Sequence, residues 1–213
     1  MTEGQAGAPT TLLLLRHGET ALTSQRRISG SGGGDPALSA TGRRQAEAVA
    51  GALAARGTVQ DVVSSPLARC RETARTVALR LGLDVTIDEG LREADYGAWE
   101  GLTFAEVRER FPQELAAWRR SPTVAPGRTG ETFASVSRRV SRSRDRILAR
   151  HAGRTVLVVS HVAPLRTLVR LALGAPPASL FRMELAAASV SVLSYDSHGT
   201  ASVRALNDIS HLG

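Results

Sequence analysis

The chain has 213 residues, of which 42% are hydrophobic, so it is long enough for one domain with a substantial core, with or without a small cap. All 27 basic residues are arginine and the net charge is +7, a balance that attracts anionic ligands. The absence of lysine excludes Schiff-base, P-loop and lysine general-base chemistry, and the single cysteine, Cys70, excludes an internal disulfide and a cysteine-based zinc site.

The composition also limits partners and location. The arginines are spread along the predicted helices, and aromatic residues make up only 4% of the chain, which is poor for stacking on bases. We therefore attribute most arginines to codon usage in a GC-rich genome and expect no nucleic-acid partner. No run of residues reaches the roughly 18 apolar positions of a membrane span, so no membrane partner is expected either. With one cysteine and no signal peptide, the expected location is the cytoplasm.

Residues 1–10 are small and polar and are expected to be a disordered lead-in or linker remnant, with the domain over residues 11–213.

The first predicted strand carries the most informative motif. The apolar run from Leu12 predicts a buried strand, which ends at Arg16 and His17 before a glycine. In open α/β sheets ligands bind at such strand ends. An imidazole can attack phosphorus and a guanidinium can hold two phosphate oxygens, although a chance Arg-His pair is the alternative.

The remaining elements alternate between helices and strands. A helix from Ser39 to Arg56 stops at Gly57, a strand follows over 59–65, and the next helix is opened by Pro66 and closed by Gly82 before a strand over 83–87. Short helices over 103–111 and 113–120 come next, then a Pro/Gly loop over 121–130 and a helix over 132–151. The chain continues with a strand over 155–160, a helix over 163–173, and strands over 189–195 and 202–206. This alternation predicts an α/β fold, namely a three-layer α/β/α sandwich with a mostly parallel central sheet and a small helical cap.

Three more segments add candidate site residues. The strand over 155–160 ends in His161, so parallel pairing with the first strand would bring His161 to the edge where His17 lies. Arg69 falls in the first turn of the helix after Pro66, where the helix dipole favours anions. A loop with glycines and aromatics then offers three candidate acids, Glu93, Asp95 and Glu100, and their spacing does not choose among them.

Together these motifs resemble the histidine phosphatase superfamily, also called the phosphoglycerate mutase-like family. The matching segments, in the family's order, are Arg16-His17-Gly18-Glu19-Thr20, Ser65-Pro66-Leu67-Ala68-Arg69 with Thr73-Ala74, Glu93 with Gly97-Ala98-Trp99-Glu100-Gly101, and Ser160-His161, and they cover residues 12 to about 206. The chain is most similar to the acid phosphatase domain fused behind a ribonuclease H domain in some bifunctional bacterial proteins, and to alpha-ribazole phosphatases. A fusion to, or association with, a ribonuclease H domain is therefore an expectation.

The resemblance implies a role for each matching residue. His17 would be the nucleophile that forms a phosphohistidine, Arg16, Arg69 and His161 would hold the phosphoryl oxygens, and Glu93 would donate a proton to the leaving group. Fixed cations of this kind stabilise the charge of a phosphoryl group in transit, so neither a cofactor nor a metal is expected.

Substrate contacts are implied for three further residues. They are Arg27, Thr23, which stands where the mutases of the family have asparagine, and Val162, which stands where many relatives have a small residue.

The expected function is a metal-independent phosphomonoesterase of the acid phosphatase type, acting on a small phosphorylated metabolite such as alpha-ribazole phosphate. One alternative is a 2,3-bisphosphoglycerate-dependent mutase, against which the compact segment between Glu93 and His161 and the threonine at position 23 argue. The other is a non-catalytic module that binds phosphate or nucleic acid.

Residues at the predicted mouth of the site bear on specificity. Leu22, Ile28, Trp99, Phe104 and Trp118 are expected to line or flank it, with packing between cap and core favoured for Phe104 and Trp118. His151, His198 and His211 lie outside all motifs and are expected at the surface.

Overall fold

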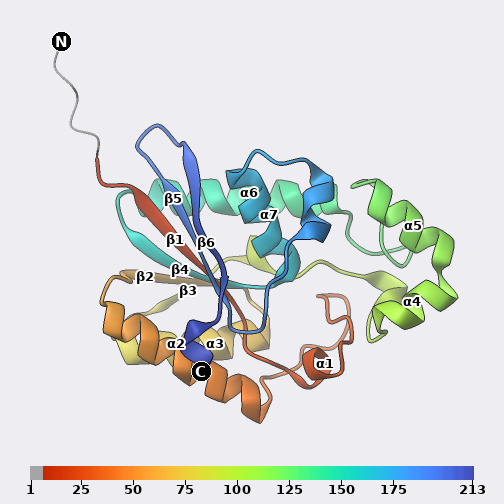
Figure 1. Ribbon diagram of the computed structural model, residues 1–213, viewed down its shortest axis with the longest axis horizontal. Helices are drawn as coiled ribbons and strands as arrows, with labels where there is room; N and C mark the ends of the chain where they lie inside the picture. The colour runs from red at the N-terminus through yellow and green to blue at the C-terminus, as the bar shows by residue number, and fades with distance from the viewer. Residues whose placement is uncertain (1–6) are drawn as a thin grey trace.

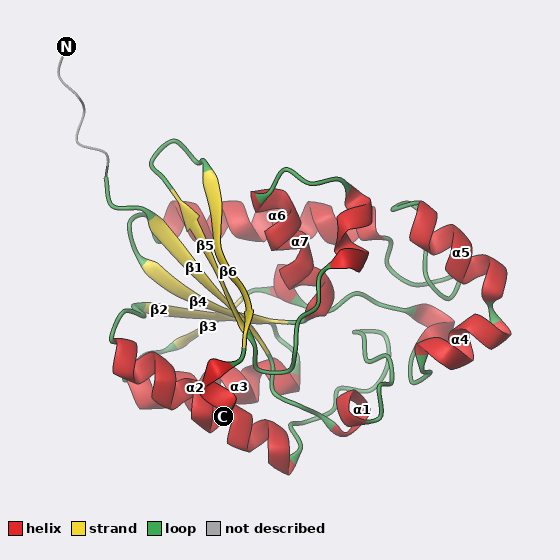
Figure 2. Cartoon of the chain, in the orientation of Figure 1, coloured by secondary structure: helices red, strands yellow, loops and turns green. Residues whose placement is uncertain are grey.

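The computed structural model describes residues 7–213, which form a six-stranded sheet between two layers of helices (Figures 1 and 2). The strands are β1 (Thr10–Arg16), β2 (Asp61–Ser64), β3 (Val85–Ile87), β4 (Thr155–Ser160), β5 (Val190–Tyr195) and β6 (Ala201–Asp208). They lie in the order β3-β2-β4-β1-β5-β6. The pairs β3-β2, β2-β4 and β4-β1 are parallel, whereas β5 is antiparallel to both of its neighbours. The mostly parallel α/β sandwich expected from the sequence is confirmed.

The helices cover both faces of the sheet and extend beyond one side of it. They are α1 (Ala21–Ser24), α2 (Ala40–Arg56), α3 (Ala68–Leu81), α4 (Phe104–Arg110), α5 (Pro112–Arg120), α6 (Phe133–Arg150) and α7 (Val162–Ala172). In Figure 1, α2 and α3 lie below the sheet and α6 and α7 above it, while α4 and α5 form a cap to the right.

The central strands are apolar throughout because both of their faces are buried. Leu12 and Leu14 of β1 belong to the core cluster that includes α6 and α7, whereas Leu13 and Leu15 belong to the cluster that includes α2 and α3. Successive side chains of a strand point to opposite faces, so one leucine run supplies both cores. This packing holds the carboxyl ends of β1 and β4 side by side.

Local signals account for the helix ends near the site. The Ser39 hydroxyl accepts a hydrogen bond from the Gly42 backbone and caps α2, which ends at Gly57 in the left-handed conformation. Pro66 lies before α3 and does not open it, which corrects the predicted start of this helix. The first amide of α3, on Ala68, donates instead to both carboxylate oxygens of Asp35, at 3.0 and 2.9 Å.

Three further details differ from the sequence-based picture. Thr10 belongs to β1, so the strand starts one residue inside the expected lead-in, most of which lies outside the described residues. The short helix α1 and a 3-10 helix over Pro177–Arg182 were not predicted.

Among the described residues, no helix combines the length and apolarity that crossing a bilayer requires.

Candidate active site

The two histidines of the motifs meet at the carboxyl edge of the sheet. Arg16 of β1 pairs in register with Ser160 of β4, and the backbone amide of His17 donates to the Ser160 carbonyl at 3.1 Å. The rings of His17 and His161 are 5.1 Å apart between centroids, at an interplanar angle of 61°. The structure therefore places both histidines together, as the parallel-strand argument predicted.

The imidazole of His17 is oriented by the backbone beside it. Its Nδ1 lies 2.7 Å from the Gly18 carbonyl, which is an acceptor, so Nδ1 carries the proton and the Nε2 lone pair is left free. His17 as a whole is only 5% exposed. Burial, together with the guanidinium groups of Arg16 and Arg69, lowers the pKa of His17 well below its usual value. His17 is thus neutral at physiological pH and retains a basic nitrogen.

Gly18 permits the turn that positions His17. A side chain at this position would collide with the carbonyl of Gly42 at the start of α2, so the backbone approach requires glycine. The amide of Gly18 donates to the Thr73 hydroxyl at 3.2 Å, and that hydroxyl donates to the Arg69 carbonyl at 2.8 Å. The loop after β1 is in this way tied to the helix that carries Arg69.

Arg16 is half-buried and Arg69 is buried, and among residues 7–213 both lack an acceptor for one buried N–H group beside His17. Arg16 donates through Nη1 to the Leu185 carbonyl at 2.6 Å, and Arg69 donates through Nη2 to the Ser29 carbonyl at 3.0 Å. Arg69 is 1% exposed, and its Nη1 lies 3.5 Å from the Asp35 carboxylate. The Nε atoms of Arg16 and Arg69 are buried and find no acceptor among residues 7–213. Buried N–H groups are rarely left unpaired, so this pair of guanidinium groups is suited to an anion.

His161 lies against the start of α3, with its ring completely buried. Its Nε2 is 2.7 Å from the Ser65 hydroxyl and 3.3 Å from the Cys70 sulfur. Burial and the positive charge of Arg69 lower the pKa of His161 well below its usual value, so the ring is neutral. Burial raises the pKa of the Cys70 thiol, which is therefore uncharged beside it.

Of the three candidate acids, only Glu93 is buried, and it lines the same cavity as His17. Its Oε1 accepts from the amides of Ala94, at 2.9 Å, and Ala163, at 3.3 Å, and the side chain is 5% exposed. Burial raises its pKa above the ordinary 4.5 for a glutamate. Asp95 instead accepts from the Gly97 amide at 2.8 Å, and Glu100 accepts from loop amides. Burial and position in the cavity lining thus distinguish Glu93 from Asp95 and Glu100, which spacing did not.

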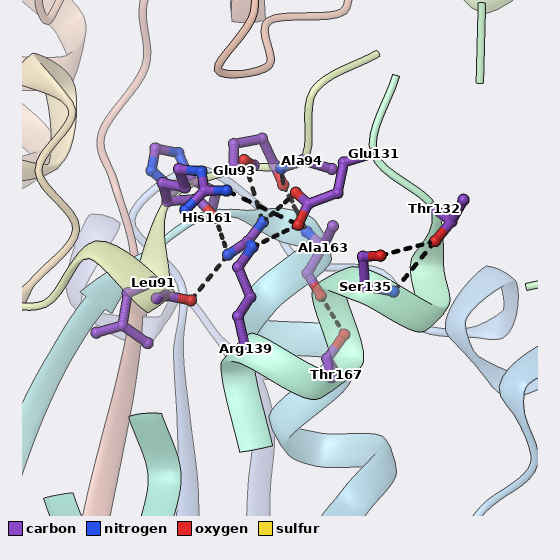
Figure 3. A network of polar contacts seen from close by, with 12 residues as sticks. Leu91, Glu93, Ala94, Glu131, Thr132, Ser135, Arg139, His161, Ala163 and Thr167 are labelled. Carbon is purple, nitrogen blue, oxygen red and sulfur yellow. Dashed lines mark hydrogen bonds and ion pairs between the residues drawn. The ribbon is translucent and has the colours of Figure 1, made fainter. Parts of the chain in front are cut away.

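Arg139 of α6 anchors the loop that carries Glu93 (Figure 3). Its Nη2 donates to the Glu93 carbonyl at 3.2 Å, and its Nη1 donates to the Arg92 carbonyl at 2.7 Å. The guanidinium also forms a two-pronged pair with the Glu131 carboxylate, at 2.8 Å from Nε and 2.7 Å from Nη2. Such pairs fix geometry as well as charge, so the Glu93 backbone is held in one place.

A cavity of about 930 Å³ opens in front of these residues. Arg16, His17 and Glu93 line it, while Arg69 and His161 are buried outside its lining. Five aromatic residues also line it, from the cap, from the start of α6, from the 3-10 helix over Pro177–Arg182 and from the loop after Glu93. They are Tyr96, Phe104, Trp118, Phe133 and Phe181. Trp118 lies 4.9 Å from Phe133 and 5.0 Å from Phe181 between ring centroids. The cavity is far larger than one phosphoryl group, so it has room for a sizeable leaving group.

The three residues expected to contact substrate all line this cavity. The hydroxyl of Thr23 is 3.0 Å from that of Thr20. Val162 is the first residue of α7. Arg27 is already engaged, because its Nη1 donates to the Gly101 carbonyl at 2.7 Å and to Glu106 of α4 at 3.2 Å. Arg27 therefore links the core to the cap, and only its remaining donors can reach a ligand.

The expectation for the mouth is wrong for Trp99. Ile28, Phe104 and Trp118 line the cavity, whereas Leu22 and Trp99 are not in its lining. Trp99 is completely buried in the core, where its ring packs at 5.4 Å against that of Trp118. Trp118 both packs between cap and core, where it is only 4% exposed, and contributes to the cavity lining.

The histidines outside the motifs lie away from the cavity lining, and two of them are not fully exposed. His198 is exposed, whereas His151 is 3.1 Å from the Asp61 carboxylate and His211 bonds to the Ala188 carbonyl at 2.9 Å. Among residues 7–213, no group of three His, Cys, Asp or Glu side chains is placed to hold a metal ion.

The sequence interpretation missed several polar residues of the cavity, among them Arg166 and Tyr96. Arg166 follows Val162 by four residues on α7, so helical periodicity puts both on one face and could have revealed it. Tyr96 carries no comparable signal because it lies in a loop without a regular period.

At the strand ends of this α/β sheet, an imidazole, a half-buried guanidinium group and a buried carboxyl group line one cavity, and a second, buried guanidinium group lies behind it. These are the features of a phosphoryl-transfer protein. The chain belongs to the histidine phosphatase superfamily (branch 1), whose family match covers residues 12–209. The resemblance stated from the sequence motifs is confirmed, and with it the expectation that the chain is an enzyme of the histidine phosphatase class.

Two curated relatives indicate the range of similar proteins. The bifunctional protein Rv2228c of Mycobacterium tuberculosis is 50% identical over 209 residues, which are 98% of this chain and 57% of that protein. The chain thus spans little more than half the length of this relative. Phosphoserine phosphatase 1 of Hydrogenobacter thermophilus is 33% identical over 202 residues, covering 95% of this chain and 94% of that protein.

Solved structures agree in fold. YhfR of Bacillus stearothermophilus superimposes with a TM-score of 0.86 at 33% identity, covering 96% of this chain and 100% of that chain. A putative alpha-ribazole-5'-P phosphatase from Escherichia coli gives a TM-score of 0.81 at 29% identity, covering 93% of this chain and 96% of that chain. The three-layer α/β fold is therefore shared over nearly the whole chain.

Proposed function

We propose that this chain is a phosphomonoesterase that works through a phosphohistidine on His17. The observation that carries the proposal is the pair of buried Nε–H groups of Arg16 and Arg69, which find no acceptor in the described part of the chain and accompany an imidazole with a free Nε2. Both arginines lie close enough to His17 to lower its pKa. A phosphoryl group bound there would supply the missing acceptors and present its phosphorus to the free nitrogen.

In the first step the Nε2 lone pair of His17 attacks phosphorus and the bond to the ester oxygen breaks. The negative charge on the transferring group is balanced by Arg16 and Arg69, with His161 and its Ser65 partner at the rear of the site. The leaving oxygen takes a proton from Glu93, whose raised pKa keeps it protonated to higher pH than an ordinary glutamate. The products of this step are the alcohol, phosphohistidine and a Glu93 carboxylate.

In the second step water attacks the phosphohistidine. The Glu93 carboxylate takes a proton from that water, the P–N bond breaks, and the electron pair returns to His17. Inorganic phosphate leaves and both residues regain their starting protonation. Arg139 keeps the Glu93 loop in place through both steps by its bonds to the Glu93 and Arg92 carbonyls.

The compact cap supports hydrolysis over intramolecular phosphoryl transfer. In a mutase, the bound intermediate reorients beside the phosphohistidine before it takes the phosphoryl group back. Water must be excluded during that time, because it would hydrolyse the phosphohistidine. Here the cap consists of α4 and α5, of 7 and 9 residues, over a cavity large enough to admit water beside a ligand. These features favour a phosphatase.

Three finer expectations stay proposals. Alpha-ribazole phosphate is a candidate substrate, since a structure named for this activity superimposes well and the aromatic residues of the cavity lining could hold a flat ring. A partner domain is suggested because a longer mycobacterial relative is named bifunctional, and we propose a ribonuclease H domain for that part. We also propose the cytoplasm as the location, consistent with a buried free cysteine.

The test is turnover of p-nitrophenyl phosphate together with detection of the covalent intermediate. We expect alkaline rapid quench followed by mass spectrometry to find phosphate on His17, and the His17→Ala variant to lose turnover. His198→Ala, which changes an exposed histidine, is the matched control and should behave as wild type.

Near-wild-type kcat in His17→Ala, or phosphate on another residue, would contradict the mechanism. Binding of phosphate without turnover would favour a non-catalytic module, and conversion of 3-phosphoglycerate to 2-phosphoglycerate faster than its hydrolysis would favour a mutase.

A further inference from the structure

The cavity contains a positive charge that the proposed chemistry does not use. Arg166 of α7 lines the cavity, and its side chain is half-buried. Its Nε is buried and finds no acceptor among residues 7–213. Burial lowers the pKa of this guanidinium, yet the group stays charged at any physiological pH. A half-buried cation with an N–H group that lacks an acceptor is what we expect at an anion-binding site without its ligand.

The other cationic groups of the cavity are in different situations. Arg16 belongs to the phosphoryl site, and Arg27 is paired with Glu106 at 3.2 Å. Arg26, Arg119 and Arg182 also line the cavity but are exposed, where water screens their charge. Arg166 therefore stands apart, because it is neither fully hydrated nor fully satisfied.

Tyr96 adds a second donor to the cavity that Arg166 lines. It lines the same cavity, and the charge of Arg166 acts on its phenol group. Burial raises the pKa of Tyr96 well above its usual value, so the hydroxyl keeps its proton and can donate it in a hydrogen bond. The carboxylates whose charge acts on Arg166 are those of Glu93, the proposed proton donor, and Glu184, which is exposed.

We propose that Arg166 and the Tyr96 hydroxyl form a second anion subsite, and that the preferred substrate is a phosphomonoester whose leaving group carries another anionic group, a carboxylate or a second phosphate. Arg166 lies one helical turn, about 6 Å along the axis, beyond Val162 at the start of α7. A compact ester with its two anionic groups a few bonds apart can therefore span both subsites. This inference rests on the proposed phosphatase activity and ranks anionic esters above neutral ones.

The test uses esters that differ in one group. In 3-phosphoglycerate a carboxylate replaces the terminal hydroxymethyl group of glycerol 3-phosphate, and glycerol 1,3-bisphosphate carries a second phosphate instead. We expect wild type to prefer one or both anionic esters in kcat/KM. Arg166→Met should remove that preference, lowering kcat/KM about 10- to 100-fold for the preferred ester and less than about 3-fold for glycerol 3-phosphate. The ester that loses more identifies the second group.

Controls separate this subsite from other roles of Arg166. Arg120→Met removes an equal charge from an exposed position at the end of α5, outside the cavity lining, and should leave the preference intact. Arg166→Lys should restore part of it. If Arg166 served only to tune Glu93, Arg166→Met would slow all three esters equally and shift the pH–rate profile. That outcome, or equal wild-type activity on all three esters, would overturn the subsite. Absence of phosphoenzyme and of turnover on every ester would instead overturn the proposed function.

Discussion

Replacing Glu93 with glutamine tests the proposed acid with two readouts. The change keeps shape, and one amide oxygen can retain both bonds that Oε1 accepts from Ala94 and Ala163. It removes only the proton that the leaving group needs. We expect hydrolysis of an alkyl phosphate to fall on the order of 10²- to 10⁴-fold. Phosphorylation of His17 by p-nitrophenyl phosphate should fall far less, because p-nitrophenolate leaves without a proton.

The second readout is stability. The buried carboxyl has a raised pKa, so the folded protein holds this proton more tightly than the unfolded chain does. Stability contributed by Glu93 is therefore complete below pH 4.5 and is lost as pH rises through the folded pKa. Every tenfold increase in proton affinity corresponds to about 1.4 kcal/mol. Glu93→Gln should thus be more stable than wild type at pH 8, and this advantage should vanish near pH 4.

Glu100→Gln is the matched control, and its effect on stability should have the opposite sign. Glu100 uses both oxygens, accepting from the Gly30 amide at 2.8 Å and from the Tyr96 amide at 3.1 Å. An amide can keep only one of these bonds, so the variant should lose on the order of 1–3 kcal/mol at pH 8. Rapid-quench kinetics and urea denaturation at the two pH values provide the measurements. Equal losses with both esters in the phosphorylation step, or a Glu93→Gln variant less stable at pH 8, would refute the reasoning, and Asp95→Asn would be tested next.

Two further outcomes are expected. Chelation with EDTA should leave turnover of p-nitrophenyl phosphate unchanged, since Arg16, Arg69 and His161 supply the cationic and polar groups; a loss restored by Mg²⁺ or Zn²⁺ would contradict this. The pH–rate profile should have an acidic to near-neutral optimum, because the lowered pKa of His17 keeps the nucleophile neutral at low pH and the raised pKa of Glu93 extends the acid form upward. A rate still rising above pH 9 would exclude Glu93 as the acid.

The sequence by itself determined the parts of this protein that depend on neighbours along the chain. Alternating helices and apolar strands predicted the α/β sandwich, and histidines that close two apolar strands predicted that His17 and His161 would meet. Gly57 and Gly82 predicted where α2 and α3 end. These features follow from local periodicity and backbone geometry, which a single sequence displays directly.

Only the tertiary structure decided features that depend on burial and on contacts between distant segments. Glu93, Asp95 and Glu100 have similar surroundings in sequence, and the fold alone buries Glu93 beside Ala163 while Asp95 and Glu100 bond to loop amides. Arg139 reaches the Glu93 loop from a helix more than 40 residues away in sequence. Trp99 entered the core rather than the cavity, and Arg166 was left with an unmet donor. A carboxyl or guanidinium takes its chemistry from desolvation and from its partners, and both are set by how the chain folds back on itself.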